Sequence, residues 1–334
     1  MPLLTPAGSP ASSLGLGTRG HRGARKDTDP GDAERAIAAA IEAGCTLIEC
    51  GPQWGESERL VGAAVRALRA RDRVLVATRV DTDGALPTVG AVRAAIEASL
   101  RACKLEALPL VWLDGWRDAW LDAPPWPELA ASLADRVRDG DVLAWGLGVD
   151  DLAAAERVTT VDVAAIGVRW SLFDRRAERG LIPAAVAAGR AVVARSPLAD
   201  GALGGELAPG VRFRPEDERR AWSPQRLAAL PPALAGLTAF TRNAPPAARA
   251  SDDGRAILDG LRRHPELVHA TVAELAIAAC VATPGISSTI IGVRTPAHAA
   301  AWWPIGPAPL PAAVATALAS RPWGEGWYGV AADA

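Results

Sequence analysis

Short apolar runs and amphipathic segments alternate along most of the chain. Apolar runs with strand-like composition predict strands at 46–50, 73–80, 108–114, 142–149, 163–170, 191–196 and 288–293. Ala-rich segments between them predict helices at about 32–43, 56–70, 88–103, 127–139, 151–157, 176–188 and 270–282. Strands and helices that take turns indicate parallel strands joined by crossovers. Six or seven such units in 334 residues favour a closed (β/α)8 TIM barrel, in the α/β class, over an open sheet.

The region from about 202 to 265 interrupts this alternation. It contains the Pro-, Gly- and charge-rich pieces GVRFRPEDERR, LPPALAG and RNAPPAARASDDG. Such composition indicates a long, partly helical excursion over the barrel mouth rather than a second domain. We therefore predict a single barrel domain over residues 1–334.

Composition narrows the class of partner. Lys and Arg number 36 against 38 Asp and Glu, a formal net charge of −2, which gives no electrostatic attraction to nucleic acid or to an anionic membrane. The N-terminus lacks a signal-peptide pattern, and no uncharged apolar window approaches 18 residues. We expect a cytoplasmic protein that binds a small molecule, and the oligomeric state stays open.

Cysteines and histidines give no metal or disulfide pattern. The cysteines are Cys45, Cys50, Cys103 and Cys280, without a C-x-x-C pair, and the histidines are His21, His264, His269 and His298, without metal-ligand spacing. We predict no metal site and interpret at least three cysteines as small buried hydrophobes. Cys50 follows Glu49 on a strand, so the two side chains point to opposite faces and a catalytic thiol is not expected.

Several stretches, taken together, resemble the aldo-keto reductase family, in particular its bacterial and potassium-channel β-subunit-like branches. They include LGLGTRG (14–20), AIAAAIEAGCTLIECGPQWGESERLVG (36–62), RVLVATRV (73–80), VVARSPLADGALGG (192–205) and AELAIAACVATPGISSTIIGVRTP (273–296). Their order and spacing span almost the whole chain. The resemblance implies the barrel fold and places LGLGTRG in a hairpin at the barrel floor rather than in a dinucleotide-binding loop.

The same resemblance implies altered chemistry at the catalytic positions. Reductases of the family use an Asp, a Tyr that protonates the carbonyl oxygen, a Lys and a His. These four positions fall on Glu49, Trp54, Arg79 and Asp114. An indole supplies no proton at neutral pH and a guanidinium keeps its proton above pH ~12, so ordinary carbonyl reduction is not expected.

Cofactor positions are altered as well. The resemblance places the nicotinamide amide contacts on Asp150 and Asp151, and the stacking Tyr on Arg195, while adenine contacts are missing near Ala301 and Trp302. A vestigial phosphate loop survives in Ser196, Leu198 and Gly201, with Arg294 at a 2′-phosphate position. We expect no cofactor, NADPH included.

Glu49, Arg79 and Asp114 each end a strand, so we expect them to converge at the barrel mouth. One interpretation is a relic ion pair between Glu49 and Arg79 beside a solvated Asp114. The other is redox-neutral acid/base catalysis, such as dehydration, cyclisation or isomerisation in specialised metabolism, by a carboxylate whose pKa is raised among Trp rings. A non-catalytic binding or regulatory subunit and a residual NADPH-dependent oxidoreductase are the alternatives.

Tryptophan is abundant, with 12 residues against one Tyr and three Phe. A substrate pocket for an apolar, aromatic or cationic molecule is predicted from five residues: Trp54, Trp116, Trp120, Trp170 and Arg195. If Leu113 points into the barrel, its neighbour Trp112 faces the helix layer instead.

Overall fold

The computed structural model describes residues 2–21, 30–205, 207, 211–213, 215, 217–238, 241, 271–303, 310 and 312–319. Contacts divide the chain into two compact units. The first comprises Met1–Arg169, Arg176–Arg195 and Gly285–Pro304, and the second comprises Trp170–Arg175, Ser196–Pro284 and Ile305–Ala334. The single domain with an excursion over the mouth stays a prediction, and residues 242–265 of that excursion lie outside the described residues.

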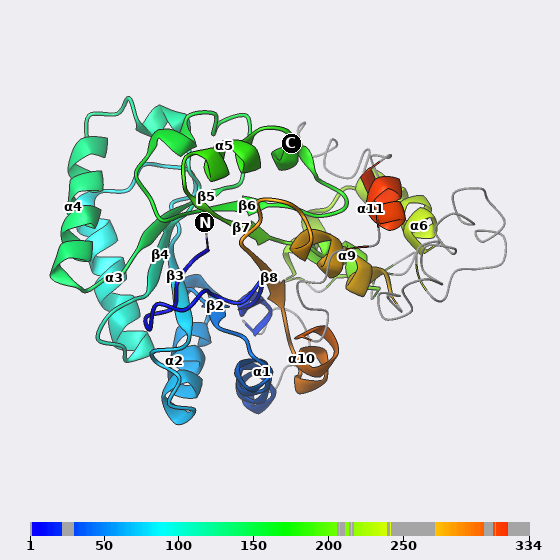
Figure 1. Cartoon of the computed structure of the whole chain (residues 1–334), viewed down its shortest axis with the longest axis horizontal. Coiled ribbons are helices and arrows are strands. Elements are labelled where there is room, and N and C mark those ends of the chain that lie inside the picture. The colour runs from blue at the N-terminus through cyan, green and yellow to red at the C-terminus, as the bar shows by residue number, and fades with distance from the viewer. Residues whose placement is uncertain are drawn as a thin grey trace. The chain divides into compact units, whose positions relative to one another are not determined.

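The first unit contains a closed barrel of eight parallel strands, as predicted (Figure 1). The strands are β1 (Leu14–Gly17), β2 (Leu47–Glu49), β3 (Leu75–Val80), β4 (Leu110–Leu113), β5 (Trp145–Val149), β6 (Ala165–Arg169), β7 (Ala191–Arg195) and β8 (Ser288–Gly292). Each strand pairs with the next, and β8 pairs with β1 to close the barrel. The carboxyl ends of all eight strands therefore meet at one opening, here called the mouth.

Strand β1 corrects one prediction. Placing LGLGTRG in a floor hairpin is wrong, because Leu14–Gly17 is a barrel strand parallel to both β2 and β8. Added Cβ atoms on Gly15 and Gly17 would each come within 2.8 Å of the Ile290 side chain. Glycine is needed for this close packing, and its low strand propensity hides the strand from the sequence pattern.

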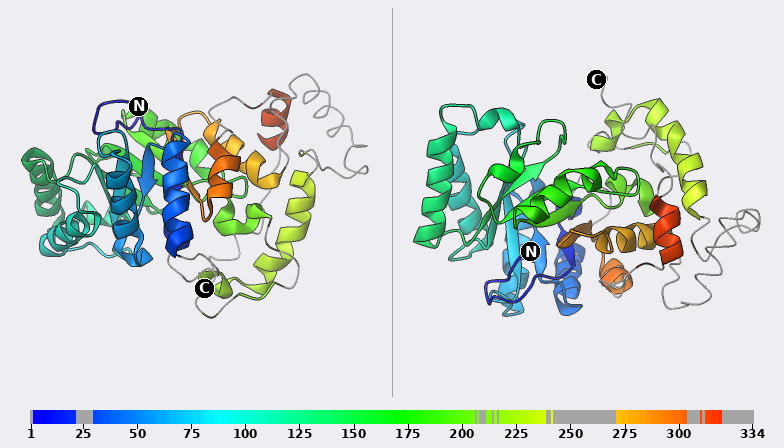
Figure 2. Two further views of the ribbon diagram at one scale, coloured as in Figure 1. Left: turned by 90° about the horizontal axis from the view of Figure 1, so that it is seen from below. Right: turned by 45° about the horizontal axis from the view of Figure 1, so that its top comes forward.

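Helices of the first unit lie outside the strands (Figures 1 and 2). They are α1 (Pro30–Glu42), α2 (Ser57–Ala67), α3 (Val89–Cys103), α4 (Trp126–Asp139), α5 (Leu181–Ala187) and α10 (Pro296–Trp302), with short 3₁₀ turns η1 (Arg19–His21), η2 (Pro52–Trp54), η3 (Asp118–Trp120), η4 (Val158–Thr160) and η5 (Arg176–Arg179). Helix α1 packs against α2 and α10, and α2 packs against α3. Neighbouring helices thus pack side by side around that part of the barrel.

The helix predicted at 151–157 is wrong, because this segment forms turns and bends. The Asp151 side chain accepts a hydrogen bond from the Ala153 backbone N–H at 3.0 Å, and Asp118 accepts one from the Arg157 N–H at 2.8 Å. Side-chain acceptors of this kind compete with helical hydrogen bonds for the same donors.

The second unit holds η6 (Ala199–Gly204), η7 (Glu218–Ala221), α6 (Pro224–Thr238), α9 (Val272–Val281) and α11 (Ala312–Ala319). Helix α9 starts with a reciprocal capping box between Thr271 and Glu274 and packs against α6 and η6. In the part of the chain that the structure describes, no helix has both the length and the apolarity to cross a membrane.

Alternating residues of the strands fill the barrel interior. The interior cluster comprises Leu3, Leu47, Leu75, Ala77, Leu110, Trp112, Ala165, Ala191, Val193 and Ile290. Trp112 therefore points inward, contrary to the expectation that it faces the helix layer. A Cβ on Gly146 of the adjacent strand β5 would lie 2.6 Å from the Trp112 ring, so a glycine makes room for the indole. The next inward positions towards the mouth carry charge.

Candidate functional site

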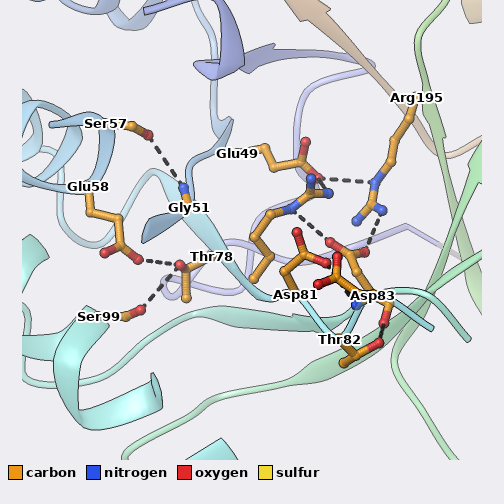
Figure 3. Close-up of polar contacts among 12 residues, drawn as sticks. Glu49, Gly51, Ser57, Glu58, Thr78, Asp81, Thr82, Asp83, Ser99 and Arg195 are labelled. Carbon is orange, nitrogen blue, oxygen red and sulfur yellow. Dashed lines mark hydrogen bonds and ion pairs between the residues drawn. The ribbon is translucent and has the colours of Figure 1, made fainter. Parts of the chain in front are cut away.

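Four charged side chains occupy the mouth, at the ends of four strands. Glu49 ends β2, Arg79 lies near the end of β3, Asp114 directly follows β4, and Arg195 ends β7. Each follows an inward-facing residue by two positions, so strand alternation points it inward as well. Figure 3 shows Glu49 and Arg195 meeting at this point.

These residues form a closed charge ring in which acids and arginines alternate. Arg79 Nη2 lies 3.4 Å from Glu49 Oε1, and Arg79 Nε lies 2.8 Å from Asp114 Oδ2. Arg195 Nη1 lies 2.6 Å from Asp114 Oδ1, and Arg195 Nε lies 3.1 Å from Glu49 Oε1. Two cations and two anions balance, so the ring carries no net charge.

The ring is largely removed from solvent, with side-chain exposures of 6% for Glu49, 8% for Asp114, 13% for Arg79 and 12% for Arg195. Burial acts to raise the pKa of Asp114, but the charges of Arg195 and Arg79 and the hydrogen bond from Arg195 outweigh it and hold the pKa below its ordinary value. A raised pKa is therefore wrong for Asp114, which stays ionised.

Arg195 remains a cation for the converse reason. Burial acts to lower its pKa, but the carboxylates of Asp114 and Glu49, the hydrogen bond to Asp114 and the charge of Asp150 raise the pKa above that of a free guanidinium. The ring consequently has fixed positive charge on both sides of each acid.

Each arginine of the ring lies over an indole. Arg79 Cζ is 4.5 Å from the Trp54 ring centroid, and Arg195 Cζ is 4.6 Å from that of Trp112. These distances fall within the range of cation–π attraction. Trp54 is only 3% exposed, so its indole is a buried packing partner of Arg79. Trp112 was missed as a site residue, although its position two residues before Asp114 on one strand puts both on the same face.

The remaining predicted pocket tryptophans are buried in protein. Trp116 and Trp120 pack edge to face at 5.4 Å, and Trp126 of α4 packs on Trp116 at 5.1 Å. The Trp116 N–H donates to Asp118 Oδ1 and the Trp120 N–H donates to the Gly84 carbonyl. Trp170 is also buried and belongs to the second unit. This packing explains their burial, and a contact of these residues with substrate stays a prediction.

Two glycines make room for the charge ring. A Cβ on Gly148 of β5 would lie 1.8 Å from Asp114 Oδ1 and 2.7 Å from Arg195 Nη1. A Cβ on Gly167 of β6 would lie 2.8 Å from Arg195 Cζ. Any other residue type at these positions displaces part of the ring, so both glycines are positioning residues.

Residues at the nicotinamide-binding positions have other partners. The Arg195 guanidinium is paired with Glu49 and Asp114 rather than presenting an apolar stacking face. Asp150 and Asp151 are exposed carboxylates, and Asp151 stabilises the turn at Ala153. None of the three offers the neutral amide or flat ring that holds a nicotinamide in the family pattern.

The vestigial phosphate loop carries its own anion. Ser196, Leu198 and Gly201 lie in the second unit, where the Ser196 hydroxyl donates to Asp200 Oδ1 at 3.2 Å. Asp200 Oδ2 also lies 3.9 Å from Arg226 Nη2, so this carboxylate is part of an ion pair within the second unit. Arg294 lies in the first unit, where its side chain packs near Gly20.

All four cysteines are buried, which confirms the prediction that at least three of them are buried. Cys50 points away from the mouth, and its pKa is well above the usual value because of its hydrogen bond with Cys103, burial and nearby acids. Such a thiol is protonated at neutral pH and is not an activated nucleophile.

Comparison with known proteins finds relatives that are named reductases or oxidoreductases. Aldo-keto reductase YhdN of Bacillus subtilis is 28% identical over 221 residues, which cover 64% of this chain and 66% of that protein. Uncharacterized oxidoreductase Rv2298 of Mycobacterium tuberculosis is 31% identical over 218 residues, 63% of this chain and 64% of its own length. The match thus spans slightly under two thirds of these relatives.

Solved structures share the fold. The glycerol dehydrogenase AKR11B4 from Gluconobacter oxydans superposes with a TM-score of 0.68 at 22% identity, covering 95% of this chain and 94% of that one. The holo form of aldo-keto reductase AKR11C1 from Bacillus halodurans gives a TM-score of 0.66 at 19% identity, covering 93% and 92%. The model of the Aldo/keto reductase family matches residues 13–320, and the chain therefore belongs to this family.

Proposed function

We propose that this member of the family catalyses a redox-neutral proton-transfer reaction on a small molecule, without NADPH. Dehydration, cyclisation and isomerisation are the reactions in this class. The observation that carries the proposal is the closed charge ring of Glu49, Arg79, Asp114 and Arg195 at the mouth. The ring combines carboxylates with fixed cations, and Trp54 stands where the resemblance requires a proton donor.

Glu49 is the proton-transfer group in this proposal. Both of its arginine contacts use Oε1, whereas Asp114 uses Oδ2 for Arg79 and Oδ1 for Arg195. The second oxygen of Glu49 points away from the ring in Figure 3. Glu49 therefore has an oxygen for a substrate proton, while Asp114 is an ionised anchor that holds the two guanidinium groups in place.

Arg79 and Arg195 stabilise negative charge that develops on the substrate. Both guanidinium groups are preorganised by carboxylates and indole rings, so they need little rearrangement during the reaction. In this proposal their N–H groups donate to a carbonyl or carboxylate oxygen of the substrate.

The test starts with a screen of small hydroxy and keto compounds, followed by mass spectrometry for products that are isomers or have lost water. On a substrate so identified, Glu49→Gln should lower kcat by about 10²–10⁴-fold, the usual contribution of a general acid or base. The control Asp81→Asn changes an exposed acid just after β3 and should leave kcat unchanged. Full activity in both Glu49→Gln and Asp114→Asn would exclude the proposal.

A non-catalytic binding or regulatory subunit is a second candidate. It is favoured by the charge balance of the ring, in which both acids are neutralised by arginines. A partner that binds equally well to wild type and Glu49→Gln in a pull-down, with no turnover in the screen, would support this function.

A residual NADPH-dependent oxidoreductase is the third candidate. It is favoured by the family and by the oxidoreductase names of the relatives. Arg195 opposes it, because its guanidinium is paired with two carboxylates and does not provide a flat stacking face for a nicotinamide.

A further inference from the structure

A second group of reactive side chains lies on the opposite face of β2 and β3 from the charge ring. Cys50 directly follows β2, Glu58 lies in the first turn of α2, and Cys103 is the last residue of α3. All three are buried, and their two sulfur atoms and a carboxylate oxygen all lie within 4.8 Å of one another. We call Cys50, Glu58 and Cys103 the thiol–carboxylate cluster.

We propose that the thiol–carboxylate cluster binds one divalent transition-metal ion of the zinc type. Thiolate and carboxylate groups are zinc ligands, with Zn–S distances of about 2.3 Å and Zn–O distances of about 2.0–2.2 Å. Tetrahedral geometry at those distances separates the ligand atoms by roughly 3.6–3.8 Å. The observed separations need a contraction of about 1 Å at most to reach it.

Hydroxyl groups beside Glu58 complete the surroundings. Thr78 Oγ1 donates to Glu58 Oε1 at 2.5 Å and lies 3.4 Å from Ser99 Oγ (Figure 3). Hydrogen bonds of this kind orient a ligating carboxylate and strengthen metal binding. A water molecule can supply the fourth ligand that tetrahedral zinc requires.

Charge and packing both suit a cation here. Metal binding releases the thiol protons of Cys50 and Cys103 to solvent without oxidation, so two thiolates, one carboxylate and a divalent ion leave a net charge of about −1. The Arg66 guanidinium, which donates to the Cys103 carbonyl at 2.6 Å, partly balances it. A Cβ on Gly62 would lie 2.0 Å from the Cys103 carbonyl oxygen, so α2 and α3 are in direct backbone contact and hold the ligands together.

The remaining cysteines provide matched controls. Cys45 and Cys280 are also buried, but neither belongs to a group of three candidate ligands within the described residues. The histidine spacing that predicted no metal site did not reveal this cluster, because its ligands come from three elements far apart in sequence.

The experiment uses the full chain, purified under reducing conditions, stripped with a chelator and titrated with Co²⁺ and with Zn²⁺. We expect one equivalent of metal by elemental analysis, a thiolate-to-cobalt charge-transfer band and a raised Tm. Cys50→Ser and Cys103→Ser should each abolish the charge-transfer band, and Glu58→Gln should weaken metal binding about 10–100-fold. The control variants Cys45→Ser and Cys280→Ser should keep both the band and the metal affinity of the wild type.

X-ray absorption spectroscopy of the cobalt-loaded wild type identifies the coordinating atoms directly, so this test does not depend on whether the variants fold. Two sulfur ligands with lighter atoms are expected. A first shell without sulfur, or failure of the wild type to bind one equivalent, would overturn the proposal. Neither result bears on catalysis at the mouth, because the cluster faces away from the charge ring.

Discussion

At the scale of single residues, Asp114 is the most constrained member of the charge ring. It holds Arg79 through one oxygen and Arg195 through the other. Removing its charge leaves two largely buried guanidinium groups with Glu49 as their only partner in the ring. Loss of one member of a buried ion pair commonly costs about 3–5 kcal/mol. We expect a cost of that order for Asp114→Asn at pH 7.

The same residue predicts how stability depends on pH. The folded pKa of Asp114 lies below its unfolded value of about 3.9. The stabilisation that ionised Asp114 contributes to the folded state is therefore fully present above that unfolded pKa, and it is lost as pH falls through the folded pKa. The difference in free energy of unfolding between wild type and Asp114→Asn should shrink from pH 7 to pH 3, as measured by urea denaturation at each pH.

A matched control is Glu34→Gln, which changes an exposed acid on α1. The free energy of unfolding of this variant should differ little from that of the wild type at pH 7 and at pH 3. A difference for Asp114→Asn that stays constant or grows as pH falls would contradict the assigned ionisation of Asp114.

At the scale of secondary-structure elements, β5 has to run close to the charge ring. Gly148→Ala places a methyl group 1.8 Å from Asp114 Oδ1, which forces the carboxylate or the strand to move. Overpacking of this kind costs about 1–3 kcal/mol. We expect a lower Tm and, on an identified substrate, a lower kcat.

Gly90→Ala is the matched control for that change. Gly90 lies in the first turn of α3, and a Cβ added there would meet no atom within 4 Å beyond its own helix backbone and chain neighbours. Alanine is favoured over glycine in a helix by roughly 0.5–1 kcal/mol, so Tm should stay equal or rise. Equal Tm values for the two variants would show that β5 does not need glycine at 148.

Periodicity predicted seven of the eight strands and most helices to within a few residues. It failed where side chains carry no periodic signal. Gly15 and Gly17 conceal β1, and the side chain of Asp151 diverts a helix-like segment into a turn. Trp112 was ambiguous because β4 is apolar on both faces, and its inward direction is seen only in its packing with the barrel core and beside Gly146.

The site was predictable to a similar degree. The strand-end rule identified Glu49, Arg79 and Asp114, because each position follows from one strand alone. The ion pair between Arg195 and Asp114 joins the ends of β7 and β4, and no local sequence pattern predicts a contact between strands so far apart in the chain. The sign of the Asp114 pKa shift depends on that pairing, and this is why the raised pKa predicted for a carboxylate of the site does not apply to Asp114.

At the scale of the whole molecule, binding of NADPH separates the candidate functions. A ligand at 100 times its Kd stabilises a protein by about 2.7 kcal/mol. We expect no change in Tm and no change in tryptophan fluorescence on titration with NADPH, because the Arg195 guanidinium is paired with Glu49 and Asp114 and offers no flat stacking face for the nicotinamide. A saturable rise in Tm would favour the residual oxidoreductase over the redox-neutral enzyme.

The alternation of charge in the ring also determines how far its electrostatic potential extends from the mouth. The two positive and two negative groups of the charge ring have no net charge, so their combined potential decays steeply with distance. The ring by itself therefore contributes little attraction or repulsion for ionic molecules beyond the Debye screening length of about 8–10 Å at ordinary ionic strength. The exposed carboxylate of Asp150, whose charge acts on Arg195, is not part of this balance, so a salt dependence of encounter with the mouth would report such surrounding charges rather than the ring.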